Sequence, residues 1–236
     1  MNVRPGTLET ALFAIAFALS GLVLLALVWS GAGAYEQIAL SNGVGGTALV
    51  ARGSTGATEE VRVDLGTLVE YHRQWTAYVT GGVSVPPVFG RALFTSDEYA
   101  HMADVRRVFD AAKILIPAGL FVMAVRLQRA RALGGRVALR LVRDGTIVAA
   151  VAVAIVALGA VFAFAPLFLL FHAVFFPEGN FLFDPATSNL VRLYPEWYWE
   201  GVTFRVGLSF LGLAAAVGGA AGWGLRRARS TRLGAA

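Results

Sequence analysis

The 236-residue chain is strongly apolar: 57% of its residues are hydrophobic, only 15% are charged, and its mean hydropathy is +0.65. Soluble chains average roughly 45–50% apolar and about 25% charged residues, so this composition excludes an ordinary soluble protein and indicates a membrane protein. The chain contains no cysteine, and the formal net charge is +5. The lack of cysteine excludes disulfides, a thiol nucleophile and zinc–thiolate sites.

Four apolar segments approach the roughly 20 residues that one bilayer crossing requires. We predict an all-α membrane protein with one membrane domain over residues 1–236. Its four transmembrane helices are expected at about residues 10–31, 108–125, 146–171 and 204–225. The first segment is followed by small residues, as in a signal-peptide cleavage site. Because its apolar run exceeds the roughly 7–15 residues of a signal-peptide core, we expect it to be retained as a span.

Arginines predict the orientation of these spans. Residues 126–145 carry six arginines and one aspartate, and four more arginines follow Leu225. The face that holds both termini then has 11 basic and 2 acidic residues, whereas the opposite face has 9 basic and 13 acidic residues. The positive-inside rule therefore predicts an N-in/C-in topology. The basic isoelectric point near 10.1 is explained by this topology, and we expect no nucleic-acid partner.

Two segments are left on the opposite, extracytoplasmic face. Residues 34–107 are predicted to form a small α/β insertion between the first two helices. Within it, 47–51 is a β-compatible run, 61–79 has the spacing of an amphipathic surface helix, and Phe89–Phe94 is expected to be a short strand. Residues 172–203 are rich in aromatic residues and contain glycine and proline, which favours an irregular loop at the membrane surface.

His101 and His172 are the main candidates for chemistry. Each lies where an apolar segment meets a polar one, and the predicted topology brings both to the same membrane surface. Histidine exchanges a proton near neutral pH, so such a pair is a candidate acid/base centre. Asp104 lies one helical turn after His101 and either orients its imidazole or serves as a first-turn acid of a helix. His72, in the predicted surface helix, is expected to be exposed and without a role.

The remaining candidates have two interpretations each. Arg107 and Arg192 could bind a lipid headgroup or an oxyanion, or belong to a solvated rim. The aromatic residues of the second outer segment could form an interfacial belt, or line a groove for acyl chains. We take the candidate substrate-binding residues to be Arg107, Arg192, Tyr194, Phe175, Phe176 and Trp197.

The residues alone leave other classes of function open. Two histidines on neighbouring spans could clamp a b-type haem and make an electron carrier. His101, Asp104 and His172 could bind a metal in a membrane hydrolase, although no local ligand spacing supports a metal site. A four-span protein with a purely structural role is a third possibility.

Two motifs carry a family resemblance. Residues 94–105 read Phe-Thr-Ser-Asp-Glu-Tyr-Ala-His-Met-Ala-Asp-Val, and residues 171–176 read Phe-His-Ala-Val-Phe-Phe, followed by Leu-Tyr-Pro at 193–195. Together they resemble the signatures of the lipoprotein intramolecular transacylases, a family of four-span bacterial membrane proteins. The resemblance implies an acyltransferase of the bacterial plasma membrane with an extracytoplasmic active face. Its partners would be diacylglyceryl-modified lipoprotein N-termini and membrane lipid. We expect a monomer without a cofactor or metal.

The reaction that this resemblance implies fits histidine chemistry. The sn-2 acyl chain of a diacylglyceryl-cysteine would move to the α-amino group of the same cysteine, giving an N-acyl lyso-lipoprotein. An α-amino group has an unperturbed pKa of roughly 7.7–8.0, so much of it must lose a proton before attack. His101 and His172 could take that proton and return it to the departing glyceryl oxygen. The substrate supplies its own nucleophile, and holding both groups in one molecule could remove much of the barrier.

Overall fold

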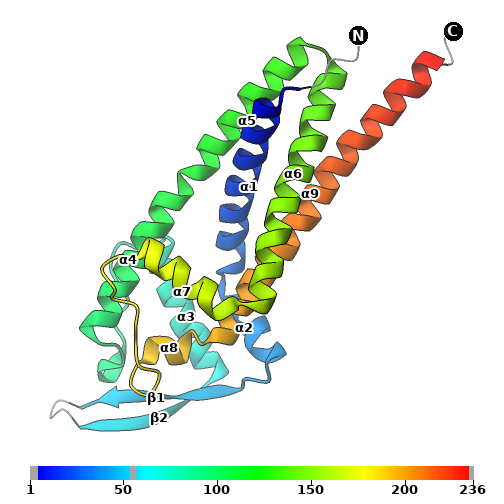
Figure 1. Cartoon of the computed structure of the whole chain (residues 1–236). Helices are drawn as coiled ribbons and strands as arrows, with labels where there is room; N and C mark the ends of the chain where they lie inside the picture. The colour runs from blue at the N-terminus through cyan, green and yellow to red at the C-terminus, as the bar shows by residue number, and fades with distance from the viewer. Residues whose placement is uncertain (1–4, 54–56, 234–236) are drawn as a thin grey trace. The chain divides into compact units, whose positions relative to one another are not determined.

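The computed structural model describes residues 5–53 and 57–233 and is mostly helical (Figure 1). The chain divides into two compact units, each with its own hydrophobic core. The first unit takes in the residues up to Leu25, residues 112–161 and the residues from Arg205 onward. The second unit consists of residues 26–111 and 162–204. Each unit therefore joins segments that are far apart in the sequence.

Within the described residues, four helices are long and apolar enough to cross a membrane, as predicted: Thr7–Trp29, Ser96–Ala132, Gly135–Phe162 and Glu196–Ala228. They correspond to α1 (Thr7–Trp29), α4 (Ser96–Lys113) with α5 (Leu115–Ala132), α6 (Gly135–Phe162) and α9 (Glu196–Leu233). The helices continue beyond most of the predicted boundaries, because hydropathy marks only the apolar part of a helix and not its polar ends.

The predicted third span, residues 146–171, is wrong at its C-terminal end. Helix α6 stops at Phe162, and Ala163 leaves the helical conformation with φ −146° and ψ 48°. A separate helix, α7 (Phe164–Phe175), follows and belongs to the second unit. Pro166 lies in the first turn of α7, where a missing backbone N–H costs no hydrogen bond. Both helices are apolar, so no polar residue marked the break.

Close helix approach holds the first unit together. Its core joins Phe13 and Phe17 of α1 to Leu141 of α6 and Phe210 of α9. A Cβ on Gly119 of α5 would lie 2.5 Å from the Ser20 hydroxyl oxygen of α1, so only glycine permits this approach. Small residues at helix contacts are typical of membrane bundles, where packing replaces the hydrophobic effect.

The second unit contains the two strands, β1 (Gly46–Arg52) and β2 (Thr58–Asp64), which form an antiparallel hairpin. The predicted run at 47–51 is confirmed, but the predicted helix over 61–79 is wrong in its first turn. Residues up to Asp64 pair in β2, and α3 (Leu65–Val79) begins after them, with the Asp64 carboxylate accepting a 2.8 Å hydrogen bond from the Thr67 amide. A capping aspartate satisfies one of the free amides of a first turn.

Three further short elements complete the second unit: α2 (Ala32–Ser41), the 3-10 turn η1 (Gly90–Ala92) and α8 (Asn189–Leu193). The turn η1 replaces the strand predicted over Phe89–Phe94. This segment forms no strand because Phe89 and Phe94 turn inward onto Trp75, with ring centroids 5.6 and 5.4 Å away. Aromatic packing of this kind gives the second unit a core of its own.

Candidate active site

His101 lies in the second turn of α4. Hydrogen bonds of Glu98 fix the first turn of that helix, both to the preceding residue Thr95 and to α8. The Glu98 carboxylate accepts a 2.7 Å hydrogen bond from the Thr95 amide, while the Thr95 hydroxyl oxygen accepts one from the Glu98 amide. This is a capping box, which fixes where the helix starts. The other carboxylate oxygen of Glu98 accepts hydrogen bonds from the Ser188 hydroxyl at 2.6 Å and the Leu190 amide at 2.8 Å. Buried Glu98 thereby joins α4 to α8.

His172 lies near the end of α7. Its Nδ1 donates a 2.8 Å hydrogen bond to the Phe168 carbonyl, one turn earlier in the helix. A carbonyl oxygen can only accept, so Nδ1 carries the proton and Nε2 of the neutral imidazole keeps a free lone pair. Burial lowers the pKa of His172 below its ordinary value of 6.5. At neutral pH the side chain is therefore an uncharged base.

The structure brings His101 and His172 together inside the second unit. Their ring centroids are 6.1 Å apart and their planes differ by 18°. Only 7% of His101 and 9% of His172 is exposed. Phe176 packs against both rings, at 4.8 Å from His101 and 5.3 Å from His172. Phe181 packs on His172 and Phe183 on His101, so aromatic side chains enclose the pair.

Asn180 links this pair to Asp104. The Asn180 side-chain amide donates a 2.5 Å hydrogen bond to one carboxylate oxygen of Asp104, and Arg107 donates to the other. Asn180 is also close enough to His101 for the two side chains to interact. Two buried atoms on these neighbours, His101 Nδ1 and Asn180 Oδ1, have no hydrogen-bond partner. The two atoms are chemically complementary, because an imidazole Nδ1–H donates and an amide Oδ1 accepts.

His72 occupies a quite different place, and the expectation that it is exposed is wrong. Only 1% of its surface is accessible. Its Nε2 donates to the Ser30 carbonyl at 2.9 Å, its Nδ1 accepts from the Tyr194 hydroxyl at 3.2 Å, and its ring stacks on Tyr35. Burial lowers the pKa of His72 to about 4. Its environment is the interior of the second unit because α3 is covered on this side by the residues around Tyr194.

The candidate substrate-binding residues separate into two groups. Phe176 lies against both histidines, and Phe175 beside it is exposed. The aromatic rings of Tyr194 and Trp197 instead pack against Tyr35, in the cluster around His72. Neither of these two contacts the histidine pair in the described part of the chain.

The two candidate arginines also differ. Arg107 is exposed and pairs with Asp104 next to the site. Arg192 donates to the backbone carbonyls of Ala48 and Ala186, each at 2.8 Å, and pairs with Glu60 at 3.1 Å. These contacts fasten α8 to β1, so Arg192 stabilises the fold and is not available for a headgroup.

Among the residues that the structure describes, no group of three or more His, Cys, Asp or Glu side chains could hold a metal ion. The Asp104 carboxylate, which a His101–Asp104–His172 metal site would need, already binds Arg107 and Asn180. The arrangement is better suited to moving protons than to coordinating a cation.

Sequence reasoning missed Asn180 and Asn189 as side chains that position the site. Asn189 is buried in α8, where its amide accepts from the Val50 amide and donates to the Val50 carbonyl, both at 2.7 Å. It follows Thr187 and Ser188, and a short polar run of this kind is typical of an ordinary turn. The only local signal for Asn180 is its place in a short loop directly after the histidine motif.

The family model described as the lipoprotein intramolecular transacylase Lit matches residues 53–199 of the chain. This range contains His101 and His172 as well as His72. The structure of the membrane integral lipoprotein intramolecular transacylase Lit from Bacillus cereus is similar, with a TM-score of 0.69 and 14% identity over 94% of this chain and 97% of that one. A variant of that enzyme with a histidine-to-arginine mutation gives a TM-score of 0.64, also at 14% identity, over 95% of this chain and 93% of that one. No protein among the curated ones matches the sequence.

Proposed function

The chain belongs to the lipoprotein intramolecular transacylase family, and on that premise we propose that it moves the sn-2 acyl chain of a diacylglyceryl-cysteine lipoprotein to the α-amino group of the same cysteine. The observation that carries this proposal is the buried, nearly parallel pair of His101 and His172. Family membership supports an enzyme over a haem carrier or a purely structural protein. All the side chains of the pair come from one chain, so the proposal needs no second subunit.

The reaction exchanges an ester for an amide without a covalent enzyme intermediate. The amine nitrogen attacks the sn-2 ester carbonyl, a new C–N bond forms, and the bond between the carbonyl carbon and the glyceryl oxygen breaks. One proton leaves the attacking nitrogen and one joins the departing oxygen, so a histidine that takes the first can return it as the second. The product is an amide with a free glyceryl hydroxyl, and neither water nor a cofactor is consumed.

His172 has the properties that the base in this scheme requires. Its Nδ1 is held by the Phe168 carbonyl, which leaves Nε2 to accept a proton. The lowered pKa keeps it uncharged at the pH where the amine is partly deprotonated. Asn180 and Asp104 lie on the His101 side of the pair and would orient the second imidazole.

The apolar surroundings suit the substrate. Phe176, Phe181 and Phe183 enclose the imidazoles. Such apolar walls accommodate the part of an acyl chain next to its ester carbonyl and exclude water. Excluding water matters here because water would compete with the amine for the ester carbonyl. Arg107, exposed beside Asp104, is the one candidate arginine near the pair and would lie at the polar rim of the site.

We further propose that the protein lies in the bacterial plasma membrane with both termini and residues 126–145 in the cytoplasm, and that residues 34–107 and 172–203 face outward. The support is the charge difference of 11 basic and 2 acidic against 9 basic and 13 acidic residues. Reporter fusions after Leu133 and after Asn180 should report opposite sides of the membrane. The same side for both would reject this topology.

The deciding experiment is mass spectrometry of the N-terminal peptide of a bacterial lipoprotein co-expressed with this chain. We expect an N-acylated cysteine that carries a monoacylglyceryl group, with the total number of acyl chains unchanged. An N-acylated peptide that keeps its diacylglyceryl group would mean an external acyl donor. An unmodified diacylglyceryl peptide, with the protein folded in the membrane, would reject the activity altogether.

A further inference from the structure

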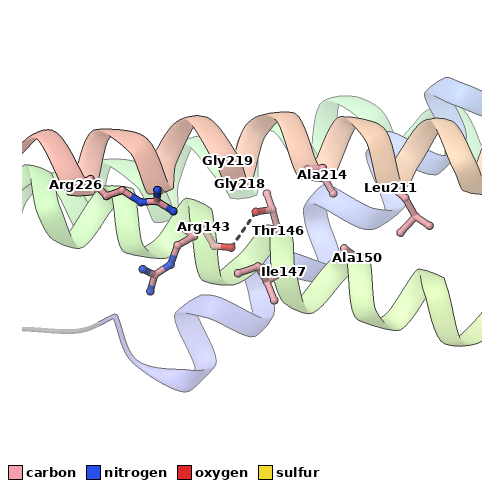
Figure 2. A pocket seen from close by; sticks show the side chains of 11 residues that line it. Arg143, Thr146, Ile147, Ala150, Leu211, Ala214, Gly218, Gly219 and Arg226 are labelled. Carbon is pink, nitrogen blue, oxygen red and sulfur yellow. Dashed lines mark hydrogen bonds between the residues drawn. The ribbon is translucent and has the colours of Figure 1, made fainter.

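A groove runs between α6 and α9 inside the first unit. Its cavity volume is about 330 Å³, within the roughly 300–1,000 Å³ of small-molecule sites. From α6 it is lined by Arg143, Thr146, Ile147 and Ala150, which recur at helical spacing and form one face. Figure 2 shows Ala150 and Leu211 of α9 at one end of the groove and the guanidinium groups of Arg143 and Arg226 at the other.

Two adjacent glycines of α9 give the groove its form. A Cβ on Gly218 would lie 2.6 Å from the Thr146 hydroxyl oxygen, so this glycine sets how closely the two helices approach. A Cβ on Gly219 would meet no atom within 4 Å, although Gly219 also lines the groove. The first glycine therefore brings the helices together, and the second leaves space beside the contact. The Thr146 hydroxyl is satisfied by the Val142 and Arg143 carbonyls and leaves the wall apolar.

The polar end of the groove is cationic. Arg143 pairs with Asp144 at 2.7 Å, which offsets part of its charge. Arg226 is exposed and has no ion-pair partner among the residues that the structure describes. An arginine fork matches the geometry of a phosphate oxygen pair better than any other side chain. One end of the groove thus fits an anionic phosphate, and the rest fits a hydrocarbon chain.

We propose that this groove binds an anionic glycerophospholipid, with one acyl chain along the small residues of α9 and the phosphate at Arg226 and Arg143. Both helices are long enough to span a bilayer, so lipid is the solvent that the groove meets. A second copy of the chain would bring further arginines against this cationic end, which is unfavourable without a counter-ion. The diacylglyceryl-cysteine substrate proposed above has no headgroup phosphate, so this site would hold a resident lipid and not the substrate.

Native mass spectrometry of the delipidated full-length protein in detergent tests the proposal. Phosphatidylglycerol, phosphatidylcholine and dioleoylglycerol are titrated separately. We expect phosphatidylglycerol to bind more tightly than the other two. Arg226→Gln should weaken it by about fivefold, the effect of one basic residue near a lipid phosphate. Gly219→Leu should weaken it at least as much, because the side chain would start from a groove-lining position where a Cβ meets no atom within 4 Å and would take up space meant for the lipid.

Matched variants separate this site from general attraction of lipid. Arg227→Gln removes the same charge from the neighbouring position, whose guanidinium lies 3.9 Å from the Trp223 ring outside the groove. Gly212→Leu adds the same side chain at another open position of α9 that does not line the groove. Both should bind phosphatidylglycerol like the wild type. Equal losses in a variant and its control, equal binding of all three lipids, or a dimer that Gly219→Leu disrupts without loss of lipid would overturn the proposal.

Discussion

His72 and the pair of His101 and His172 lie in the same unit and are all buried, yet their surroundings differ in one decisive respect. Both ring nitrogens of His72 have hydrogen-bond partners. In the pair, the buried Nδ1 of His101 has no hydrogen-bond partner, and His172 is bound through its Nδ1 to the Phe168 carbonyl. Buried polar atoms are nearly always satisfied in folded proteins, so an unsatisfied one points to a role other than stability.

Burial of a histidine is therefore not in itself the sign of a functional site. His72 joins the end of α1, through Ser30, to the segment that follows α8, through Tyr194. A neutral imidazole is well suited to this because one nitrogen donates and the other accepts. His101 and His172 are packed against aromatic rings instead, and the buried Nδ1 of His101 is left without a hydrogen-bond partner.

The largest effect is expected from His101→Ala and His172→Ala. Each should lower the formation of N-acyl lyso-lipoprotein by about 10²–10⁴-fold, the usual contribution of general acid–base catalysis. If the two act as one unit, the double variant should be little worse than either single variant. Mass spectrometry of the lipoprotein N-terminal peptide measures the product.

The amount of protein in the membrane and its thermal unfolding are the controls for these variants. His101→Asn and His172→Asn keep a polar side chain of smaller size and should be equally inactive. If either histidine can be replaced with near-normal product, the pair is not the acid/base centre. Independent, multiplying losses in the double variant would argue for two separate roles.

The next largest effect concerns stability. His72→Phe keeps an aromatic ring against Tyr35 but removes the hydrogen bonds to Ser30 and Tyr194. We expect it to lower the free energy of unfolding at neutral pH by about 2–3 kcal/mol, since a buried tyrosine hydroxyl loses its acceptor. The activity per folded molecule should stay within about twofold of wild type. Unfolding in detergent and product formation measure the two quantities.

The pH dependence of stability sharpens this test. The folded protein has a His72 pKa of about 4, whereas the unfolded chain has about 6.5. Between these values the unfolded state binds more protons, so stability is full above about pH 6.5 and falls as the pH drops towards 4. The His72 contribution to this loss reaches about 3 kcal/mol at most. His72→Phe should have a flatter acid profile, and an unchanged slope would mean that His72 does not remain neutral when buried.

The contrast between these histidines could be predicted only in part. The number of spans and the union of His101 with His172 followed from hydropathy, arginine positions and spacing along the chain. The exposure of His72 was predicted wrongly because the helix predicted over residues 61–79 was expected to lie on the surface. Its buried face is covered by Tyr35 and Tyr194, which come from opposite ends of the second unit's sequence. The periodicity of apolar residues shows which face of a helix can be buried, but it does not show which residues cover that face.

Hydropathy also fails to predict a helix boundary where the residues on both sides of it are equally apolar. The break at Ala163 lies between two apolar helices, so hydropathy continues through it. Asp104 was expected to orient His101 because the two are three positions apart on a helix. The structure directs that carboxylate to Arg107 on the next turn and to Asn180 across the loop. A contact across 76 residues has no signature in spacing.

A smaller effect is expected from Asn180→Ala, which removes the side chain between Asp104 and His101. We expect about a tenfold loss of activity, in line with a lost hydrogen bond to a buried group, together with normal folding. Asp104→Asn should cost less, because Asn180 would still face His101. Arg107→Gln removes the other partner of Asp104, and its loss of activity should be smaller than that of Asn180→Ala. If Arg107→Gln is as damaging as Asn180→Ala, the ion pair and not the amide orients the site.

The smallest expected effect is a shift in the pH profile of the reaction. The rate should rise with pH through the substrate amine's pKa, roughly 7.7–8.0, and an additional acid limb should follow the pKa of His172, which burial places below 6.5. Replacing Phe181, which packs 5.1 Å from the His172 ring, by serine should admit water and move this limb up towards the ordinary histidine value. At pH 6 the variant should then react more slowly than wild type relative to its own rate at pH 8. Initial rates of product formation across this range measure the limb, and a limb that stays in place would mean that His172 is not the group whose neutral form the reaction needs.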